Sequence, residues 1–239
     1  MRRGRLLDRL FELFDSTVRP GAVDEIGLCG DPAPAPRLLR ILETETREPA
    51  APYLQIKAIE ALGRLREPRA ESLLRPLVET KRFWQWRHPR ELRITAMQAL
   101  QKIDPEWARR FLPKVGLSEG ELSLAPLDVE PGNIWLRQRR YVRINLPKSL
   151  KGKVHTAQGS YPVAVDQLSL GGGVARSQCH VKPGTVVGLE FQSGLRHVRA
   201  DVLLREARPQ ELAFELVKIG LDDRLNLRRP LVALQPGSA

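Results

Sequence analysis

Two short segments in the last hundred residues carry side chains suited to binding an anion. The first, RQRRYVR at residues 137–143, places Arg139 and Arg143 four positions apart. The second, DQLSLGGGV at residues 166–174, contains Ser169 followed by three glycines. An arginine guanidinium pairs with phosphate through two parallel hydrogen bonds, and glycines let backbone N–H groups approach a ligand closely. The pattern therefore indicates recognition of an anion, with no nucleophile or general base required.

Each segment alone has a simpler interpretation. A basic string such as RQRRYVR is commonly a solvated face or a linker, and LSLGGG is commonly a tight turn between strands. The distribution of charge favours binding, because the net charge of +11 divides into +2 for residues 1–136 and +9 for residues 137–239. An anionic partner is therefore expected at the C-terminal part of the chain.

The order and spacing of the two segments resemble the PilZ domain family. Its motif has two arginines separated by three residues, followed by Asp/Asn-x-Ser-x-x-Gly. Arg139 and Arg143 match the first element, Ser169 and Gly172 match the second, and the likeness runs over residues 137–236. The resemblance implies a six-stranded antiparallel β-barrel with a terminal helix that binds the bacterial messenger cyclic di-GMP. Neighbours of the motif, Arg140 and Gly171, are expected to add a cation and backbone donors to the site.

One motif position departs from the family pattern. The residue two before the serine is Gln167 in place of Asp or Asn, and Asp166 stands one place earlier. Glutamine retains an amide that hydrogen-bonds, but its longer stem moves the head group. In a regular strand Asp166 would point to the opposite face from Gln167. Ligand binding is therefore expected to persist with weaker affinity.

The elements that must position this motif are strands. Short β-prone runs occur at residues 151–157, 160–165, 186–191, 198–205 and 212–219. Turn residues separate them, and several runs alternate between apolar and polar side chains as half-buried strands do. Strands of this length and spacing predict a closed barrel or a sandwich. Residues 221–234 predict a terminal helix, which Pro230 is expected to break or end.

The first half of the chain has a helical period instead. Residues 4–14 predict an amphipathic helix, and a Gly-, Pro- and Ala-rich loop is expected to follow it through residue 36. The strings LQIKAIEALGRL at 54–65 and LRITAMQALQKI at 92–103 resemble each other at an offset of 38 residues. Each precedes a proline-containing string that begins a new helix. A period near 40 built from helix pairs is typical of α-solenoids, and residues 35–113 look like HEAT repeats. A plain helical bundle is the alternative.

Together these patterns predict an α + β chain of two domains. We expect a HEAT-like helical domain at residues 1–116, a polar connector at 117–136, and a PilZ-like barrel with a terminal helix at 137–239. The string FWQWRHPR at 83–90 concentrates two tryptophans beside basic residues. It is expected to form a loop whose aromatics cap the helical core, with a protein-partner surface or a single-stranded nucleic-acid site as alternatives.

Other classes of site find little support in the sequence. The four histidines are scattered, Cys29 and Cys179 lie far apart, and no spacing typical of a metal site, a phosphate-binding loop or a catalytic elbow occurs. No apolar run reaches about 18 residues, so a membrane-spanning helix is excluded. We therefore expect a cytoplasmic protein without catalytic residues, metal, cofactor or membrane insertion.

The function expected from the sequence is signalling without catalysis. The barrel would bind cyclic di-GMP through Arg139, Arg143, Ser169 and Gly172 with their neighbours, and the helical domain would present a surface to a protein partner. A ligand-free PilZ-like module used only for protein interaction is the alternative, motivated by Gln167. Nucleic acid is not the expected partner.

Overall fold

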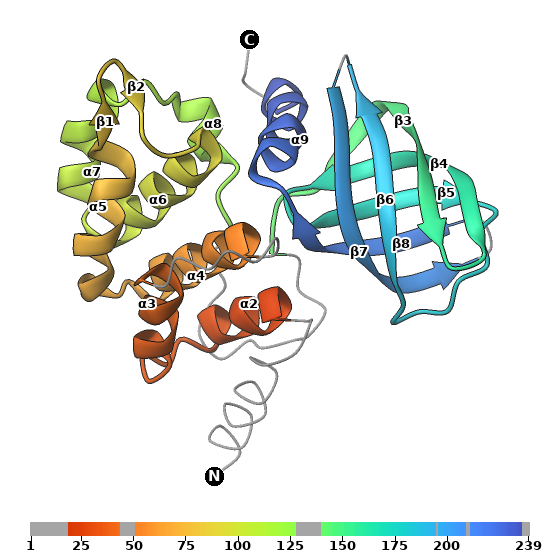
Figure 1. Cartoon of the computed structure of the whole chain (residues 1–239), viewed down its shortest axis with the longest axis horizontal. Helices are drawn as coiled ribbons and strands as arrows, with labels where there is room; N and C mark the ends of the chain where they lie inside the picture. The colour runs from red at the N-terminus through yellow and green to blue at the C-terminus, as the bar shows by residue number, and fades with distance from the viewer. Residues whose placement is uncertain (1–18, 44–50, 128–139, 195, 209–210, 236–239) are drawn as a thin grey trace. The chain divides into compact units, whose positions relative to one another are not determined.

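The computed structural model describes residues 19–43, 51–127, 140–194, 196–208 and 211–235, which belong to two compact units. The first unit, Met1–Gln138, is helical, and the second, Arg139–Ala239, is a β-barrel with one helix (Figure 1). The predicted amphipathic helix at residues 4–14 lies outside the described residues.

The described part of the first unit consists mostly of short helices. They are α2 (Arg19–Cys29), α3 (Ala35–Glu43), α4 (Ala51–Leu65), α5 (Glu71–Glu79), α6 (Arg90–Ile103), α7 (Pro105–Phe111) and α8 (Glu119–Ser123). Two single 3-10 turns, η2 (Pro68–Ala70) and η3 (Leu112–Lys114), and a two-stranded hairpin, β1 (Lys81–Arg82) and β2 (Gln85–Trp86), connect them.

Helices α2, α4 and α6 pack in sequence through small residues. A Cβ atom added at Gly27 of α2 would lie 2.8 Å from the Cα of Ala61 in α4. A Cβ atom added at Gly63 of α4 would likewise lie 2.9 Å from the Cα of Ala99 in α6. Backbones approach this closely only where no side chain separates them. The two similar strings of the sequence therefore lie in adjacent helices that meet through the same kind of contact.

The new helix predicted at the proline-containing string after residue 103 is confirmed as α7. Pro105 occupies the first turn of α7, where its missing N–H costs nothing, and the Asp104 carboxylate accepts the backbone N–H of Trp107 at 3.1 Å. Asp104 therefore caps the helix.

The prediction of a loop reaching residue 36 was wrong for residues 19–29, which form α2. Their Pro and Gly content suggested a loop. However, Pro20 lies in the first helical turn and Gly27 is a packing contact, so both residues are compatible with this helix. Burial of Val23 and Ile26 supplies the tertiary packing that outweighs weak helix propensity.

Residues 117–127, expected as part of the connector, lie against α6. Ser118 and Glu121 form a reciprocal capping box at the start of α8. The side-chain amide of Gln98 donates to the backbone carbonyl of Leu122 at 2.9 Å, and Arg90 pairs with Glu121 at 2.7 Å.

The second unit is a closed six-stranded antiparallel barrel, as the sequence predicted. Its strands are β3 (Ile144–Thr156), β4 (Gly159–Ser169), β5 (Gly172–Ser177), β6 (Val186–Ser193), β7 (Arg196–Arg208) and β8 (Glu211–Ile219). The order around the barrel is β3-β4-β5-β8-β7-β6, and the pairing of β6 with β3 closes it. Closure pairs the backbone N–H and C=O groups that the edge strands of an open sheet would leave unpaired.

Alternation along each strand fills the barrel interior with apolar side chains. Val163 and Val165 of β4, Leu189 and Phe191 of β6, and Val202 and Leu204 of β7 are all buried. Because apolar side chains fill the interior, any ligand site on this unit must be built on the outer face or at a barrel end.

The terminal helix α9 (Leu221–Ala233) contains Pro230 and continues through it, so the predicted break was wrong. Pro230 lies one turn from the end, and the backbone N–H of Leu234 still bonds to its carbonyl at 3.1 Å. The helix is fixed to β7 by Asp223, which accepts the backbone N–H of Arg199, and by Asn226, which accepts from Arg196 at 2.8 Å. None of the helices in the described part of the chain has the length and apolarity needed to cross a bilayer.

Gly63→Val tests the close helix contact. The added side chain must displace the backbone of Ala99, so we expect the free energy of unfolding to fall by about 1–3 kcal/mol. The measurement is urea unfolding followed by tryptophan fluorescence, because all four tryptophans precede residue 139. Ser72→Val, at an exposed position of α5, is the matched control. Equal stability of the two variants would contradict the packing described.

Candidate functional site

The Ser-x-x-Gly segment forms the tight turn between β4 and β5. The Ser169 hydroxyl donates to the carbonyl of Gly172 at 2.9 Å and accepts the N–H of Gly171 at 3.3 Å. The Gly171 carbonyl in turn accepts the N–H of Leu216 in β8 at 2.9 Å. Ser169 is 6% exposed, so its hydroxyl serves the shape of the turn itself.

Close approach explains why glycines occupy this turn. A Cβ atom at Gly172, whose φ is +153°, would lie 2.2 Å from the carbonyl oxygen of Phe214 in β8. A Cβ atom at Gly173 would lie 2.2 Å from the carbonyl oxygen of Gln167. Larger residues would push the turn away from β8, so these positions hold the barrel end closed.

The ring of Tyr141 packs on the same turn. A Cβ atom at Gly171 would lie 2.5 Å from Cδ2 and 2.6 Å from Cε2 of Tyr141, whose side chain is buried. The aromatic ring therefore occupies the space that any side chain at residue 171 would take. This contact joins the arginine-rich segment to the Ser-x-x-Gly turn, although the two lie about 30 residues apart in the sequence.

The register of β3 against β4 places Arg143 beside the turn. The pairing of β3 with β4 ends with Ile144 opposite Leu168, so Arg143, the residue before β3, leads toward Ser169 at the end of β4. Leu168 is buried in the barrel, and side chains alternate between faces. The outer face here therefore carries Asn145 and Gln167, which pair with each other, while Ser169 is buried in the turn.

A β-bulge changes the position of Asp166. Val165 pairs with Ala175 and Gln167 pairs with Val174, so Asp166 is the extra residue on β4. In a regular strand Asp166 would point to the face opposite Gln167, as the sequence predicts. The bulge instead brings its carboxylate to the exposed side chain of Arg176.

Asp166 is held in an ion pair on the outside of the barrel. Its carboxylate accepts from Arg176 Nε at 2.7 Å and Nη2 at 3.0 Å, and from the Ser149 hydroxyl at 2.5 Å. These hydrogen bonds, the one from Arg176 foremost, hold the pKa of Asp166 below its ordinary value. Gln167 is half-buried beside it, opposite Asn145.

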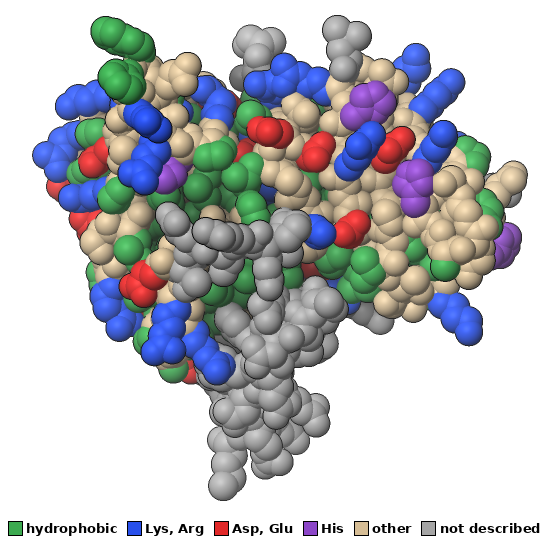
Figure 2. Space-filling model, viewed as in Figure 1, with side chains coloured by type: hydrophobic (Ala, Val, Ile, Leu, Met, Phe, Trp, Pro, Cys, Tyr) green, Lys and Arg blue, Asp and Glu red, His purple; other side chains and the backbone are tan. Residues whose placement is uncertain are grey.

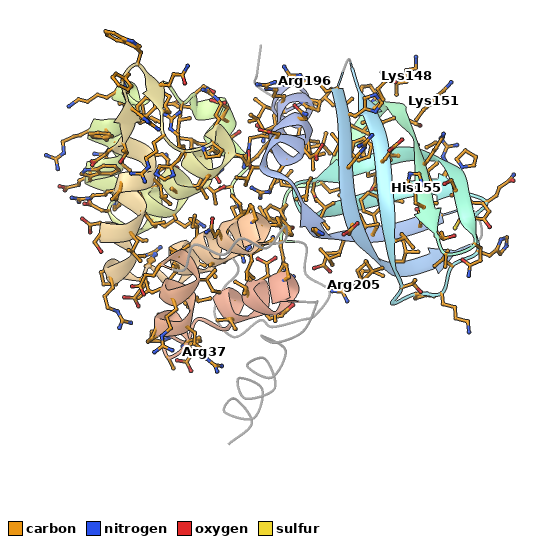
Figure 3. All side chains as sticks on the ribbon, in the orientation of Figure 1. Arg37, Lys148, Lys151, His155, Arg196 and Arg205 are labelled. Atoms are coloured by element: carbon orange, nitrogen blue, oxygen red, sulfur yellow. The ribbon has the colours of Figure 1, made fainter. Side chains whose placement is uncertain are left out.

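Glu215 places a carboxylate beside the glycine turn. It lies directly opposite Gly172 in the pairing of β5 with β8. One oxygen accepts from Arg140 Nη1 at 3.4 Å, and the other accepts from Arg205 Nε of β7 at 2.6 Å. The side chain of Arg140 is 14% exposed and that of Arg205 is 56% exposed. In Figure 3, Arg196 and Arg205 are labelled toward opposite ends of β7.

The structure thus brings most of the predicted site residues together. Arg140, Arg143, Gln167, Ser169, Gly171 and Gly172 surround one end of the barrel, whereas Asp166 is engaged by Arg176. Arg139, the first arginine of the motif, and Arg137 lie outside the described residues. Sequence reasoning missed Tyr141, Glu215 and Arg205. Tyr141 stands inside the quoted arginine segment, but nothing local marks the other two.

A shallow hollow of about 300 Å³ lies elsewhere on the barrel, over Gly188. Figure 2 shows acidic, basic and histidine side chains interspersed on the face of β6 and β7. Arg199 lies 3.4 Å and His155 3.9 Å from the Glu190 carboxylate, and Lys218 lies 3.9 Å from that of Asp201. Opposite charges there face one another, so the hollow offers an anion no net cationic surface.

Within the described ranges, no three His, Cys, Asp or Glu side chains group closely enough to hold a metal ion. Cys179 is buried, and burial raises the pKa of its thiol, which disfavours the reactive thiolate. The chemistry that the turn region offers is ion pairing, hydrogen bonding and stacking.

No family model and no curated protein matches the sequence. Among solved structures, the C-terminal part is similar to the PilZ domain of YcgR from Escherichia coli, solved with c-di-GMP. The identity is 19%, the TM-score is 0.35, and the match covers 41% of this chain and 92% of that one. The PilZ domain of CeSA from a cellulose-synthesizing bacterium matches at 16% identity and a TM-score of 0.33, over 39% and 97% of the chains. A structure of E. coli YcgR in complex with c-di-GMP matches at 22% identity and a TM-score of 0.36, over 41% and 46%. At this level of likeness, the ligand has to be argued from the residues of the site.

Arg176→Ala tests the assignment of Asp166. The folded-state pKa of Asp166 lies below its unfolded value, so the pair stabilises the fold above pH of about 4 and this contribution is lost as the pH falls through the folded pKa. We expect the variant to raise the pKa of Asp166 toward its ordinary value, measured by NMR titration of the carboxyl carbon. Lys151→Ala, which removes a different exposed cation from β3, should leave it unchanged. An unaltered pKa in Arg176→Ala would contradict the ion pair.

Proposed function

We propose that this protein is a receptor for cyclic di-GMP and that the ligand binds at the barrel end formed by the Ser-x-x-Gly turn and the arginine-rich segment. The observation that supports this most directly is the packing of Tyr141 on Gly171, which holds the two halves of the PilZ-like motif together. Arg143 directly precedes Ile144, which pairs with Leu168 beside the turn. The motif is therefore a single surface and not two unrelated strings.

The ligand's chemistry suits this surface. Cyclic di-GMP carries two phosphates and two flat guanines. A guanidinium donates two parallel hydrogen bonds to a phosphate or to the O6 and N7 edge of guanine, and it also stacks on a base. In this proposal Arg139 and Arg143 bind the ligand directly. The turn around Gly171 and Gly172 offers backbone at a point where no side chain blocks approach.

Glu215 supports a particular role for the remaining arginines. It pairs with both Arg140 and Arg205, and so lowers the cost of holding two guanidinium groups near one another. A phosphate arriving at this end would compete with Glu215 for the same donors. Arg140 thus adds positive field beside the ligand, while Glu215 keeps it oriented in the free protein.

We further propose that Gln167 takes the place of the family's Asp or Asn. It lies on the outer face opposite Asn145, whereas Asp166 is already committed to Arg176 and Ser149. A neutral amide offers both a donor and an acceptor to a guanine edge. The alternative is a PilZ-like module that has lost its ligand and serves only in protein interaction, and the longer stem of Gln167 is the observation that favours it.

We further propose that the helical unit binds a protein partner and so passes on the signal of ligand binding. The stacking of α2, α4 and α6 through Gly27–Ala61 and Gly63–Ala99 contacts supports a HEAT-like arrangement, and such repeats commonly present surfaces to protein partners. The arginine pair directly follows the segment that links the two units. Ligand binding to Arg139 and Arg143 would fix that segment and so favour one arrangement of the units over others.

Calorimetric titration with cyclic di-GMP tests the proposal. Loss of one charge-assisted, bidentate contact in Arg143→Ala should weaken binding by about tenfold to a hundredfold. Lys151→Ala removes an exposed cation from the same strand and should change the affinity by less than about threefold. Absence of heat with wild-type protein and excess ligand, or equal loss in both variants, would contradict site-specific binding.

Gln167→Asp separates the two interpretations of the motif. For a working receptor, we expect wild type to bind and the substitution to alter affinity by no more than about tenfold. Gln167→Asn, which shortens the stem without adding charge, is the matched comparison. If wild type shows no binding of cyclic di-GMP but the Gln167→Asp protein binds it, the natural site is defective and the alternative is established.

A further inference from the structure

The β1–β2 hairpin of the helical unit presents two aromatic side chains to solvent. Lys81 pairs with Trp86 and Arg82 with Gln85, which leaves Phe83 and Trp84 at the tip between the strands. Phe83 is 85% exposed and Trp84 is 94% exposed. The sequence-based expectation that these aromatics cap the helical core was therefore wrong for the tip.

The backbone holds this tip in an unusual conformation. Phe83 has φ of +58°, a left-handed conformation that bulky residues rarely adopt. Such outliers persist where the surrounding structure fixes them, and they often occur at binding segments. Figure 2 shows hydrophobic side chains standing out at the tip of the hairpin, with basic side chains nearer its base.

The base of the hairpin is anchored to α6. The guanidinium of Arg93, which is 2% exposed, lies 3.6 Å from the centroid of the Trp86 ring, and Lys81 Nζ lies 4.2 Å from it. The backbone N–H of Arg87 bonds to the carbonyl of Thr80 across the hairpin. Trp86 therefore secures the hairpin, while its neighbours Phe83 and Trp84 project beyond it.

Positive charge surrounds the aromatic pair without any acid. Lys81, Arg82 and Arg87 flank the tip, and no Asp or Glu occurs between Glu79 and Glu91. Burial first, and then the charges of Arg87 and Arg93, lower the pKa of His88, so His88 adds little to this positive charge near neutral pH.

We propose that this hairpin docks the helical unit on an anionic lipid surface, with Phe83 and Trp84 entering the headgroup region. Aromatic rings favour the membrane–water interface, and basic residues beside them are attracted to anionic lipids. The contact is peripheral and shallow, and it differs from the sequence-based expectation of no membrane insertion. It does not depend on the proposed binding of cyclic di-GMP.

The shape of the surface favours lipid over a protein partner. A stable protein interface usually needs a broad apolar centre of several hundred Å² on each partner. The other large exposed hydrophobics of the described residues, Leu127, Val142, Val186 and Leu234, lie outside the segment 79–91. A narrow convex tip needs a partner that closes around it from all sides, and a fluid headgroup layer does so without a preformed pocket.

Sedimentation of the full chain with lipid vesicles tests the proposal. With vesicles of phosphatidylcholine containing about 30 mol% phosphatidylglycerol, wild type should bind, and binding should weaken as salt rises. Phe83→Ser/Trp84→Ser should reduce the fraction bound by about tenfold, because both apolar groups are removed. Trp84→Phe should retain binding within about threefold, since an aromatic ring remains.

Val186→Ser, which removes an exposed apolar side chain from the barrel unit, is the matched control and should bind as wild type does. The expected amphipathic segment at residues 4–14 remains in every variant, so only the difference between variants reports on the hairpin. Equal binding of the double variant and the control would overturn the proposal. A second outcome would overturn it in favour of nucleic acid. In that outcome wild type binds a single-stranded oligonucleotide, the double variant does not, and the two bind vesicles equally.

Discussion

The contact between the Tyr141 ring and the backbone of Gly171 is the constraint on which the candidate site depends. The ring fills the space of a side chain at residue 171, so the arginine-rich segment is held against the β4–β5 turn. The turn itself is held by the Ser169 hydroxyl and by Leu216 of β8. The pairing of Ile144 with Leu168 and the ion pair of Arg140 with Glu215 also bring the arginine-rich segment to this end of the barrel, and the Tyr141 ring adds the direct contact with the turn.

Electrostatics then determines what this end of the barrel attracts. Residues 137–239 carry most of the chain's excess positive charge. Around the hollow over Gly188, however, acidic side chains balance the basic ones. Near the turn, a single carboxylate, Glu215, faces two arginines. Carboxylate and phosphate compete for the same guanidinium donors, so in the proposed receptor Glu215 would hold these arginines in place until a phosphate displaces it. The Phe83–Trp84 hairpin of the helical unit, flanked in the sequence by Lys81, Arg82 and Arg87, is a different surface with a different chemistry.

Much of the fold follows from the sequence, because alternation along a strand and small residues at helical spacing are local signals. On that basis the strands, the terminal helix and the helices at 54–65 and 92–103 were predicted, while the choice of a closed six-stranded barrel came from the resemblance to PilZ domains. Three features were not local. The bulge at Asp166 depends on the partner strand, the Arg205–Glu215 pair joins different strands, and the helix at residues 19–29 depends on packing of Gly27 against Ala61. Exposure of Trp84 likewise could not be read from a string that equally suits a core-capping loop.

Titration of Tyr141→Ala with cyclic di-GMP tests the central claim most directly, because this change removes no charge. The account predicts that affinity falls by about tenfold or more, since the arginine segment is no longer held against the turn, while Tyr141→Phe keeps the ring and binds as wild type does. Both proteins should first be shown to be folded by circular dichroism. Undiminished affinity in a folded Tyr141→Ala protein would contradict the claim that this contact builds the site.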